Sequence, residues 1–234
     1  MTPHPTMYST LKSTTLFASA GDDDIAAIAP LASFRDYEEG SLLFCQDHAA
    51  ETIFILVEGM VKLVSLRPDG SQITLRTVLS KEPFGALGAV RADAHYPATA
   101  EAMKRSKVIA IRSDEFRLLL LERPHLAQGL LGVITRYVRE MQERFQEMVV
   151  APVPRRIARA LVRLAAQCAT EAEGQKVVTL PFTRQDLAEI VGTTLYSVSR
   201  TIAEWERQGI VSTGRKRITV TNMELIKSLA QERD

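Results

Sequence analysis

Short apolar runs separated by turn residues fill the chain between residues 33 and 112. Within these runs apolar and polar residues alternate, as where Val61 and Leu63 flank Lys62, and a period of two residues is typical of a half-buried strand. Turns are expected at three pairs of an acidic residue and a glycine: Glu39-Gly40, Glu58-Gly59 and Asp69-Gly70. The pattern predicts strands at residues 41–45, 52–57, 61–66, 72–79 and 107–112, which form a small antiparallel sandwich or roll.

Helical patterns lie on both sides of this region. Residues 22–31 predict a short helix, because three aspartates at its start suit the positive end of the helix dipole. The residues ahead of it are interpreted as a polar leader. Residues 113–150 predict a long helix with a break near Pro124.

One stripe of the long helix is apolar, with its members three or four residues apart. The stripe consists of Leu130, Ile134, Tyr137, Met141, Phe145 and Met148. A single stripe more often packs on its own domain, but this one persists for almost three heptads and is widened by neighbouring apolar residues. We therefore predict the seam of a parallel homodimer.

Two prolines, Pro152 and Pro154, interrupt helicity and mark a domain boundary. The expected organisation is a roll with its N-terminal leader over residues 1–112, a dimerisation helix over 113–150 and a separate domain over 151–234. That last domain begins with an amphipathic helix at 155–170, a polar turn at 171–175 and a short strand at 177–180.

The segment from 183 to 202 predicts two helices joined by a sharp turn. Thr183 caps the first helix, Gly192 permits the turn and Thr194 caps the second helix. Leu187, Ala188 and Val191, then Val198 and Ile202, are the expected buried positions. This is the helix-turn-helix layout, in which the second helix enters the major groove of DNA. Residues 210–220 predict a hairpin with a basic tip, a wing.

Charge supports a polyanion partner for the C-terminal region. Residues 1–150 carry 16 Lys and Arg against 19 Asp and Glu, whereas residues 151–234 carry 13 against 9. The 234 residues are 46% hydrophobic and 24% charged, as in a globular protein, and no apolar run approaches the length of a membrane span. Two distant cysteines, Cys45 and Cys168, argue against a disulfide framework, and the absence of a signal pattern predicts a cytoplasmic protein. The sequence contains no nucleophile elbow, no HExxH motif and no phosphate-binding loop, so it does not predict an enzyme.

With these motifs the chain resembles the CRP/FNR family of bacterial transcription regulators. The resemblance rests on the glycines Gly40, Gly59 and Gly70, on the run 84–88 and, most specifically, on the segment 183–200. It implies an α+β protein with an N-terminal antiparallel β-roll of the cyclic-nucleotide-binding jelly-roll type, a long dimerisation helix and a C-terminal winged helix-turn-helix. It also implies a palindromic double-stranded DNA operator and RNA polymerase as partners.

The resemblance assigns roles on the predicted recognition helix. Arg200 stands where the family has a base-reading arginine, and its guanidinium can pair with guanine O6 and N7. Ser199 and Tyr196 are further base-reading candidates, although Tyr196 replaces the glutamate of the best-known branches. The candidate contacts to the DNA backbone are Thr183, Gln185, Thr194, Ser197, Arg215 and Lys216.

The resemblance also places an effector pocket at Phe84, Gly85, Ala86, Leu87, Gly88, Tyr96, Pro97 and Ala98. Ala86 replaces the glutamate, and Tyr96-Pro97 the arginine-serine pair, with which related proteins hold cyclic AMP, so cyclic AMP is not the expected effector. An iron–sulfur cluster is excluded because only two cysteines are present. The runs 96–102 and 192–200 are most similar to the nitrite- and nitric-oxide-responsive branch, which suggests haem with His48 or His95 as axial ligand. The alternative is a ligand-independent regulator whose roll is only a dimer scaffold.

Overall fold

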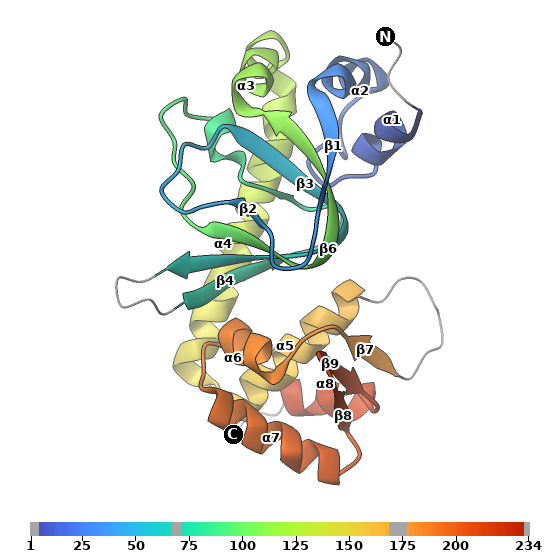
Figure 1. Ribbon diagram of the computed structural model, residues 1–234, viewed down its shortest axis with the longest axis vertical. Coiled ribbons are helices and arrows are strands. Elements are labelled where there is room, and N and C mark those ends of the chain that lie inside the picture. The colour runs from blue at the N-terminus through green and yellow to red at the C-terminus, as the bar shows by residue number, and fades with distance from the viewer. Residues whose placement is uncertain (1–4, 67–71, 169–176, 232–234) are drawn as a thin grey trace. The chain divides into compact units, whose positions relative to one another are not determined.

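The computed structural model describes residues 5–66, 72–168 and 177–231 (Figure 1). It forms two compact units, Met1–Glu140 and Met141–Asp234. Among the described residues no helix is both long and apolar enough to cross a membrane.

The first unit is built around one six-stranded antiparallel sheet that curls into a roll (Figure 1). Its strands are β1 (Ala32–Tyr37), β2 (Leu42–Phe44), β3 (Thr52–Leu66), β4 (Gln72–Val78), β5 (Pro83–Phe84) and β6 (Thr99–Arg112). The order is β1-β6-β3-β4, with β2 also paired to β6 and β5 to β3. Alternating residues such as Phe54, Leu56 and Val108 fill the roll, which confirms the predicted antiparallel β architecture.

The predicted turn at Glu58-Gly59 is wrong, because both residues lie inside the 15-residue strand β3. The register against β6 shifts on either side of Glu58, and Gly59 has φ +106°, which is the geometry of a bulge. A glycine serves a bulge for the same reason that it serves a turn, so the sequence signal was ambiguous. Strand β6 begins at Thr99, well before the predicted start at residue 107. The predicted turn Asp69-Gly70 lies outside the described residues.

Helical elements lie before, between and after the strands of the first unit. They are α1 (Pro5–Lys12), α2 (Asp22–Ile28), η1 (Ala29–Leu31), η2 (Ala86–Ala89), α3 (Ser113–Glu122) and η3 (Pro124–Leu126), followed by α4 (Ala127–Val150). The break near Pro124 and the helix at Asp22 are as predicted. The interpretation of the first residues as a polar leader is wrong, because α1 buries Met7 and Leu11 in the core of the unit.

The second unit contains α5 (Val153–Cys168), β7 (Val178–Leu180), α6 (Arg184–Val191), α7 (Leu195–Arg207), β8 (Val211–Gly214), β9 (Arg217–Val220) and α8 (Met223–Gln231). The strands form a small antiparallel sheet in the order β7-β9-β8. Helix α5 starts two residues earlier than predicted, with Pro154 in its first turn, where a missing N–H is tolerated. The predicted polar turn at 171–175 lies outside the described residues.

Candidate DNA-binding surface and effector pocket

Local capping sets where the two central helices of the second unit begin. The Thr183 hydroxyl accepts a hydrogen bond from Asp186 N at 3.0 Å, and the Asp186 carboxylate accepts from Thr183 N at 2.8 Å, which is a capping box. Gly192 ends α6 in the left-handed conformation with φ +69°. The Thr194 hydroxyl then accepts from Ser197 N at 3.2 Å and starts α7. The predicted caps and turn are thus confirmed.

Packing separates a buried face of α7 from an exposed one. Val198, Ile202 and Trp205 are buried on the inner face. Arg200 and Tyr196 are exposed four residues apart, so they share the outer face, and Ser199 is half-buried beside them. Leu195, the first residue of α7, is also exposed, and the sequence analysis missed it as part of this face. The sequence did carry an indication of this, because the predicted buried positions of the second helix were already taken by Val198 and Ile202, which leaves Leu195 on the outer face.

The candidates for contacts to the DNA backbone differ in the hydrogen bonds that their side chains already make within the protein. The Thr183 hydroxyl donates to Asp186 Oδ2 at 2.7 Å as part of the capping box, and its contact with the DNA backbone stays a prediction. Gln185 is exposed and donates to Glu189 Oε1 at 3.0 Å. Arg215 and Lys216 form the exposed tip of the β8–β9 hairpin, as predicted for a wing.

A carboxylate that the sequence analysis did not identify joins three elements of this surface. Glu206 on α7 accepts from Arg184 Nη2 at 2.9 Å, from Thr213 N at 2.8 Å and from Thr213 Oγ1 at 2.6 Å. These bonds link α7 to α6 and to β8. Arg184 and Thr213 lie 22 and 7 positions from Glu206 in the chain, so the spacing of these residues does not predict the cluster.

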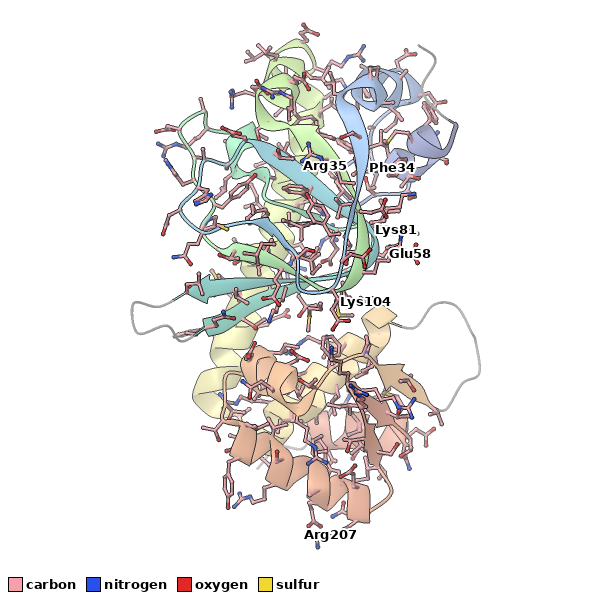
Figure 2. All side chains as sticks on the ribbon, in the orientation of Figure 1. Phe34, Arg35, Glu58, Lys81, Lys104 and Arg207 are labelled. Carbon is pink, nitrogen blue, oxygen red and sulfur yellow. The ribbon has the colours of Figure 1, made fainter. Side chains whose placement is uncertain are left out.

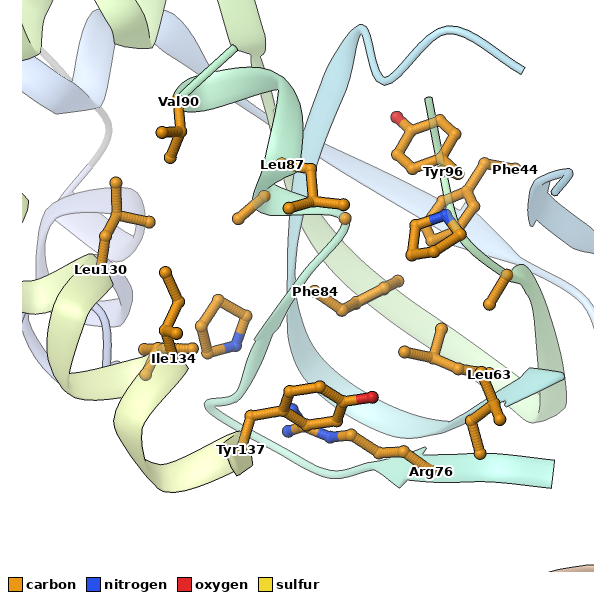
Figure 3. A pocket seen from close by; sticks show the side chains of 17 residues that line it. Phe44, Leu63, Arg76, Phe84, Leu87, Val90, Tyr96, Leu130, Ile134 and Tyr137 are labelled. Carbon is orange, nitrogen blue, oxygen red and sulfur yellow. The ribbon is translucent and has the colours of Figure 1, made fainter. Parts of the chain in front are cut away.

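A cavity of about 200 Å³ opens in the first unit between the roll and the first part of α4 (Figure 3). Seven of the eight predicted effector-pocket residues line it: Phe84, Gly85, Ala86, Leu87, Tyr96, Pro97 and Ala98. Gly88 is the exception, because it packs against the backbone of Ala50, where a Cβ atom would lie 1.7 Å from the carbonyl oxygen. Helix α4 contributes Leu130, Val133, Ile134 and Tyr137 to the wall.

Tyr96 occupies one end of this cavity and uses its hydroxyl internally. The hydroxyl donates to Thr52 O at 2.7 Å and accepts from Thr52 N at 3.0 Å. Its ring stacks on Phe44 with ring centroids 3.8 Å apart. Burial raises the pKa of Tyr96, so the hydroxyl remains protonated and neutral.

One ion pair lies at the opposite end. Arg76 Nη2 is 2.6 Å from Glu82 Oε2, and both side chains are largely buried. The Arg76 guanidinium carbon also lies 5.7 Å from the centroid of the Tyr137 ring. Among the described lining residues Arg76 is therefore the single cationic side chain, and a carboxylate compensates its charge.

The residues present do not fit a haem in this cavity. His48 and His95 are both exposed, and His95 Nδ1 lies 3.1 Å from Asp93 O. Neither histidine lines the cavity, and its described wall holds no cysteine or methionine either. Neither His48 nor His95 is therefore placed to be the axial ligand of a haem in this cavity, although His95 is next in sequence to Tyr96, which lines it.

The residues of the predicted dimer stripe on α4 differ in how far they are buried. Leu130 is buried in the core of its own unit, and Tyr137 is half-buried at the cavity. Ile134, Met141 and Phe145 are exposed, the last by 67%. The side chain of Met148 lies outside the described residues.

Two family descriptions match the two parts of the chain. Residues 34–123 match the cyclic nucleotide-binding domain, and residues 155–229 match the Crp-like helix-turn-helix domain. The chain belongs to the CRP/FNR family of transcription regulators. A CRP-like cAMP-activated global transcriptional regulator from Mycobacterium tuberculosis is 24% identical over 92% of this chain and 96% of its own length.

Solved structures show the same fold. FixK2 from Bradyrhizobium japonicum has a TM-score of 0.75 at 20% identity and covers 87% of this chain and 99% of its own. The c-di-GMP-responsive regulator CLP from Xanthomonas campestris has a TM-score of 0.73 at 16% identity over 86% and 99% of the two chains. As a CRP/FNR regulator the protein binds DNA, and its relatives are regulators rather than enzymes.

Proposed function

We propose that the protein binds as a homodimer to a DNA operator with two-fold symmetry, with α7 of each protomer in the major groove. The observation that carries the proposal is the exposed face of α7, where Tyr196, Ser199 and Arg200 stand on a capped helix-turn-helix. Arg200 reads guanine, and Ser199 and Tyr196 read neighbouring base edges. Backbone contacts come from Thr183, Gln185, Thr194, Ser197, Arg215 and Lys216. The same proposal includes the division of the chain into a roll domain (1–112), a dimerisation helix (113–150) and a DNA-binding domain (151–234). It also includes an interaction with RNA polymerase.

The cavity in the roll is the proposed effector site. It adjoins α4, so an effector there would change the packing of the helix that carries the exposed residues Met141 and Phe145. The relatives named above differ in effector, since one is cAMP-activated and another c-di-GMP-responsive. The similarity of runs 96–102 and 192–200 to the nitrite- and nitric-oxide-responsive branch supports nitric oxide as an effector. It does not support a haem held in this cavity by His48 or His95, because neither histidine lines the cavity.

A ligand-independent regulator is the second candidate. It is favoured by Tyr96, whose hydroxyl is fully engaged with Thr52 and whose ring closes one end of the cavity. Under this alternative, operator affinity would be the same for protein purified with and without extraction of small molecules.

The experiment is selection of binding sites from randomised duplexes, followed by affinity measurements with variants. We expect a two-fold symmetric site whose half-site centres are about one helical turn apart. Arg200→Ala should lose about 1–3 kcal/mol of discrimination at a guanine in each half-site, with unchanged thermal unfolding. Arg207→Ala is the matched control, because this exposed arginine lies at the far end of α7 (Figure 2). Full discrimination in a folded Arg200→Ala variant would contradict the proposal.

A further inference from the structure

The cavity in the roll has walls that are almost wholly apolar. Aromatic and aliphatic side chains meet there from the sheet, from η2 and from α4 (Figure 3). Those that define its shape are Phe44, Leu63, Phe84, Leu87, Leu130 and Ile134. Such walls favour a ligand through burial of apolar surface rather than through charge.

The polar side chains at the cavity are already satisfied or neutralised. Both hydrogen-bonding functions of Tyr96 are used by Thr52. Glu82 accepts from Arg76 Nη2 at 2.6 Å and from Leu79 N at 3.2 Å, which fixes the carboxylate against the guanidinium. Arg76 is the only residue of the described lining with an ionised side chain. An anion entering the cavity would lose its hydration and find no uncompensated positive charge.

We infer that this cavity takes a small uncharged, largely apolar organic molecule on the scale of a single aromatic ring. The size follows from its volume of about 200 Å³, since an apolar protein cavity of about 150 Å³ binds benzene. One hydrogen-bond acceptor on the ligand can face the end of the cavity where Arg76 and Tyr137 lie. The inference rests on the proposed function of the roll as an effector domain.

Glu82 is the residue that determines this preference. Without its carboxylate, Arg76 would present a net positive charge in a largely buried setting, where a charge-assisted contact to an anion is strong. Replacing Glu82 by glutamine keeps the shape of the side chain and one hydrogen-bond acceptor. The substitution should therefore change the charge preference of the cavity more than its form.

Two isosteric probes test the inference on the full chain. Acetophenone is neutral and benzoate is anionic, and both are followed by saturation-transfer NMR and titration. The unaltered protein should bind acetophenone at least about tenfold more tightly than benzoate. Ala98→Leu, which fills the cavity, should abolish acetophenone binding, whereas Ala92→Leu, at an exposed position outside the lining, should not.

Glu82→Gln supplies the second measurement. It should raise the affinity for benzoate by about tenfold relative to acetophenone, and the matched Glu58→Gln at an exposed position should leave the ratio unchanged. Equal binding of benzoate, tight binding of cyclic AMP, or no binding of acetophenone because a second copy covers the cavity would each overturn the inference. Selection of operator sites in the absence of acetophenone and benzoate tests the proposed DNA binding independently. If the protein selects an operator but does not bind acetophenone, the ligand inference fails and the proposed DNA binding stands.

Discussion

The guanidinium of Arg76 lies 5.7 Å from the centre of the Tyr137 ring, and this contact joins strand β4 to helix α4. Both residues also line the cavity in the roll. A ligand that enters the cavity therefore meets the same side chains that hold the first part of α4 against the sheet. The contact gives the proposed effector site a direct physical link to the helix.

Tyr137→Leu should lower the free energy of unfolding by roughly 1 kcal/mol, because it removes the cation–π contact while keeping an apolar side chain. Tyr137→Phe is the matched control and should retain most of the stability, since its ring still faces Arg76. Denaturant unfolding of both variants measures the difference. Equal losses in the two variants would show that the hydroxyl, and not the ring, makes the contribution.

Glu206→Gln should weaken operator binding and lower stability by about 1–3 kcal/mol, because Arg184 and Thr213 lose a charged acceptor. Glu204→Gln serves as the control on the same helix, since Glu204 pairs with the exposed Arg207 and should cost less than about 0.5 kcal/mol. Thermal unfolding and duplex titration report the two effects. Unaltered DNA affinity in Glu206→Gln would mean that this cluster does not position α7.

Phe145→Glu together with Met141→Glu should convert the proposed dimer to a monomer at micromolar concentration and weaken binding to a two-fold operator. Both side chains are exposed in a single chain, and charges would be costly in an apolar seam. Sedimentation analysis measures the oligomeric state. Leu118→Glu, at an exposed position on α3, should remain dimeric. An unchanged dimer in the double variant would refute the predicted seam.

Gly59→Ala should destabilise the roll by more than about 2 kcal/mol. A Cβ atom there would lie 2.3 Å from Ser106 Oγ and 2.5 Å from Ser106 Cα, and φ is +106°. Gly132→Ala is the contrasting variant, because nothing lies within 4 Å and the residue is helical, so stability should rise by about 0.5–1 kcal/mol. Chemical denaturation distinguishes the two outcomes.

Stability should fall in acid through Asp24. His125 Nε2 lies 2.8 Å from Asp24 Oδ2, and Arg123 Nη1 lies 2.7 Å from Oδ1. These hydrogen bonds, that of His125 first, lower the pKa of Asp24 to about 2. Since the pKa is lower in the folded state than in the unfolded chain, the stabilisation is complete above about pH 4 and is lost as the pH falls toward about 2. Unfolding of Asp24→Asn should lack this component of the pH dependence.

Several features were predictable because their causes are local. The caps Thr183 and Thr194 and the turn at Gly192 depend on side chains within a few positions of the backbone groups that they satisfy. The period of apolar residues likewise predicted α6, α7 and the strands. The basic hairpin tip and the exposed Arg200 follow from the same patterns.

Other features depended on which distant residues meet. Gly59 was equally compatible with a turn and a bulge, and the pairing of β6 along most of β3 decided for the bulge. Leu130 matched a dimer stripe, but the core of its own unit buries it. Helix α1 was hidden by its serines and threonines and is defined by what Met7 and Leu11 pack against.

The sequence by itself determined the helix-turn-helix, because short-range spacing and capping encode it, and the resemblance to the CRP/FNR family indicated the region of the proposed effector pocket. Only the tertiary structure decided that the pocket is apolar, that Glu82 neutralises Arg76, and that His48 and His95 lie outside it. The physical reason is that charge compensation and burial depend on the side chains that the fold brings together. Distance along the chain does not specify those neighbours.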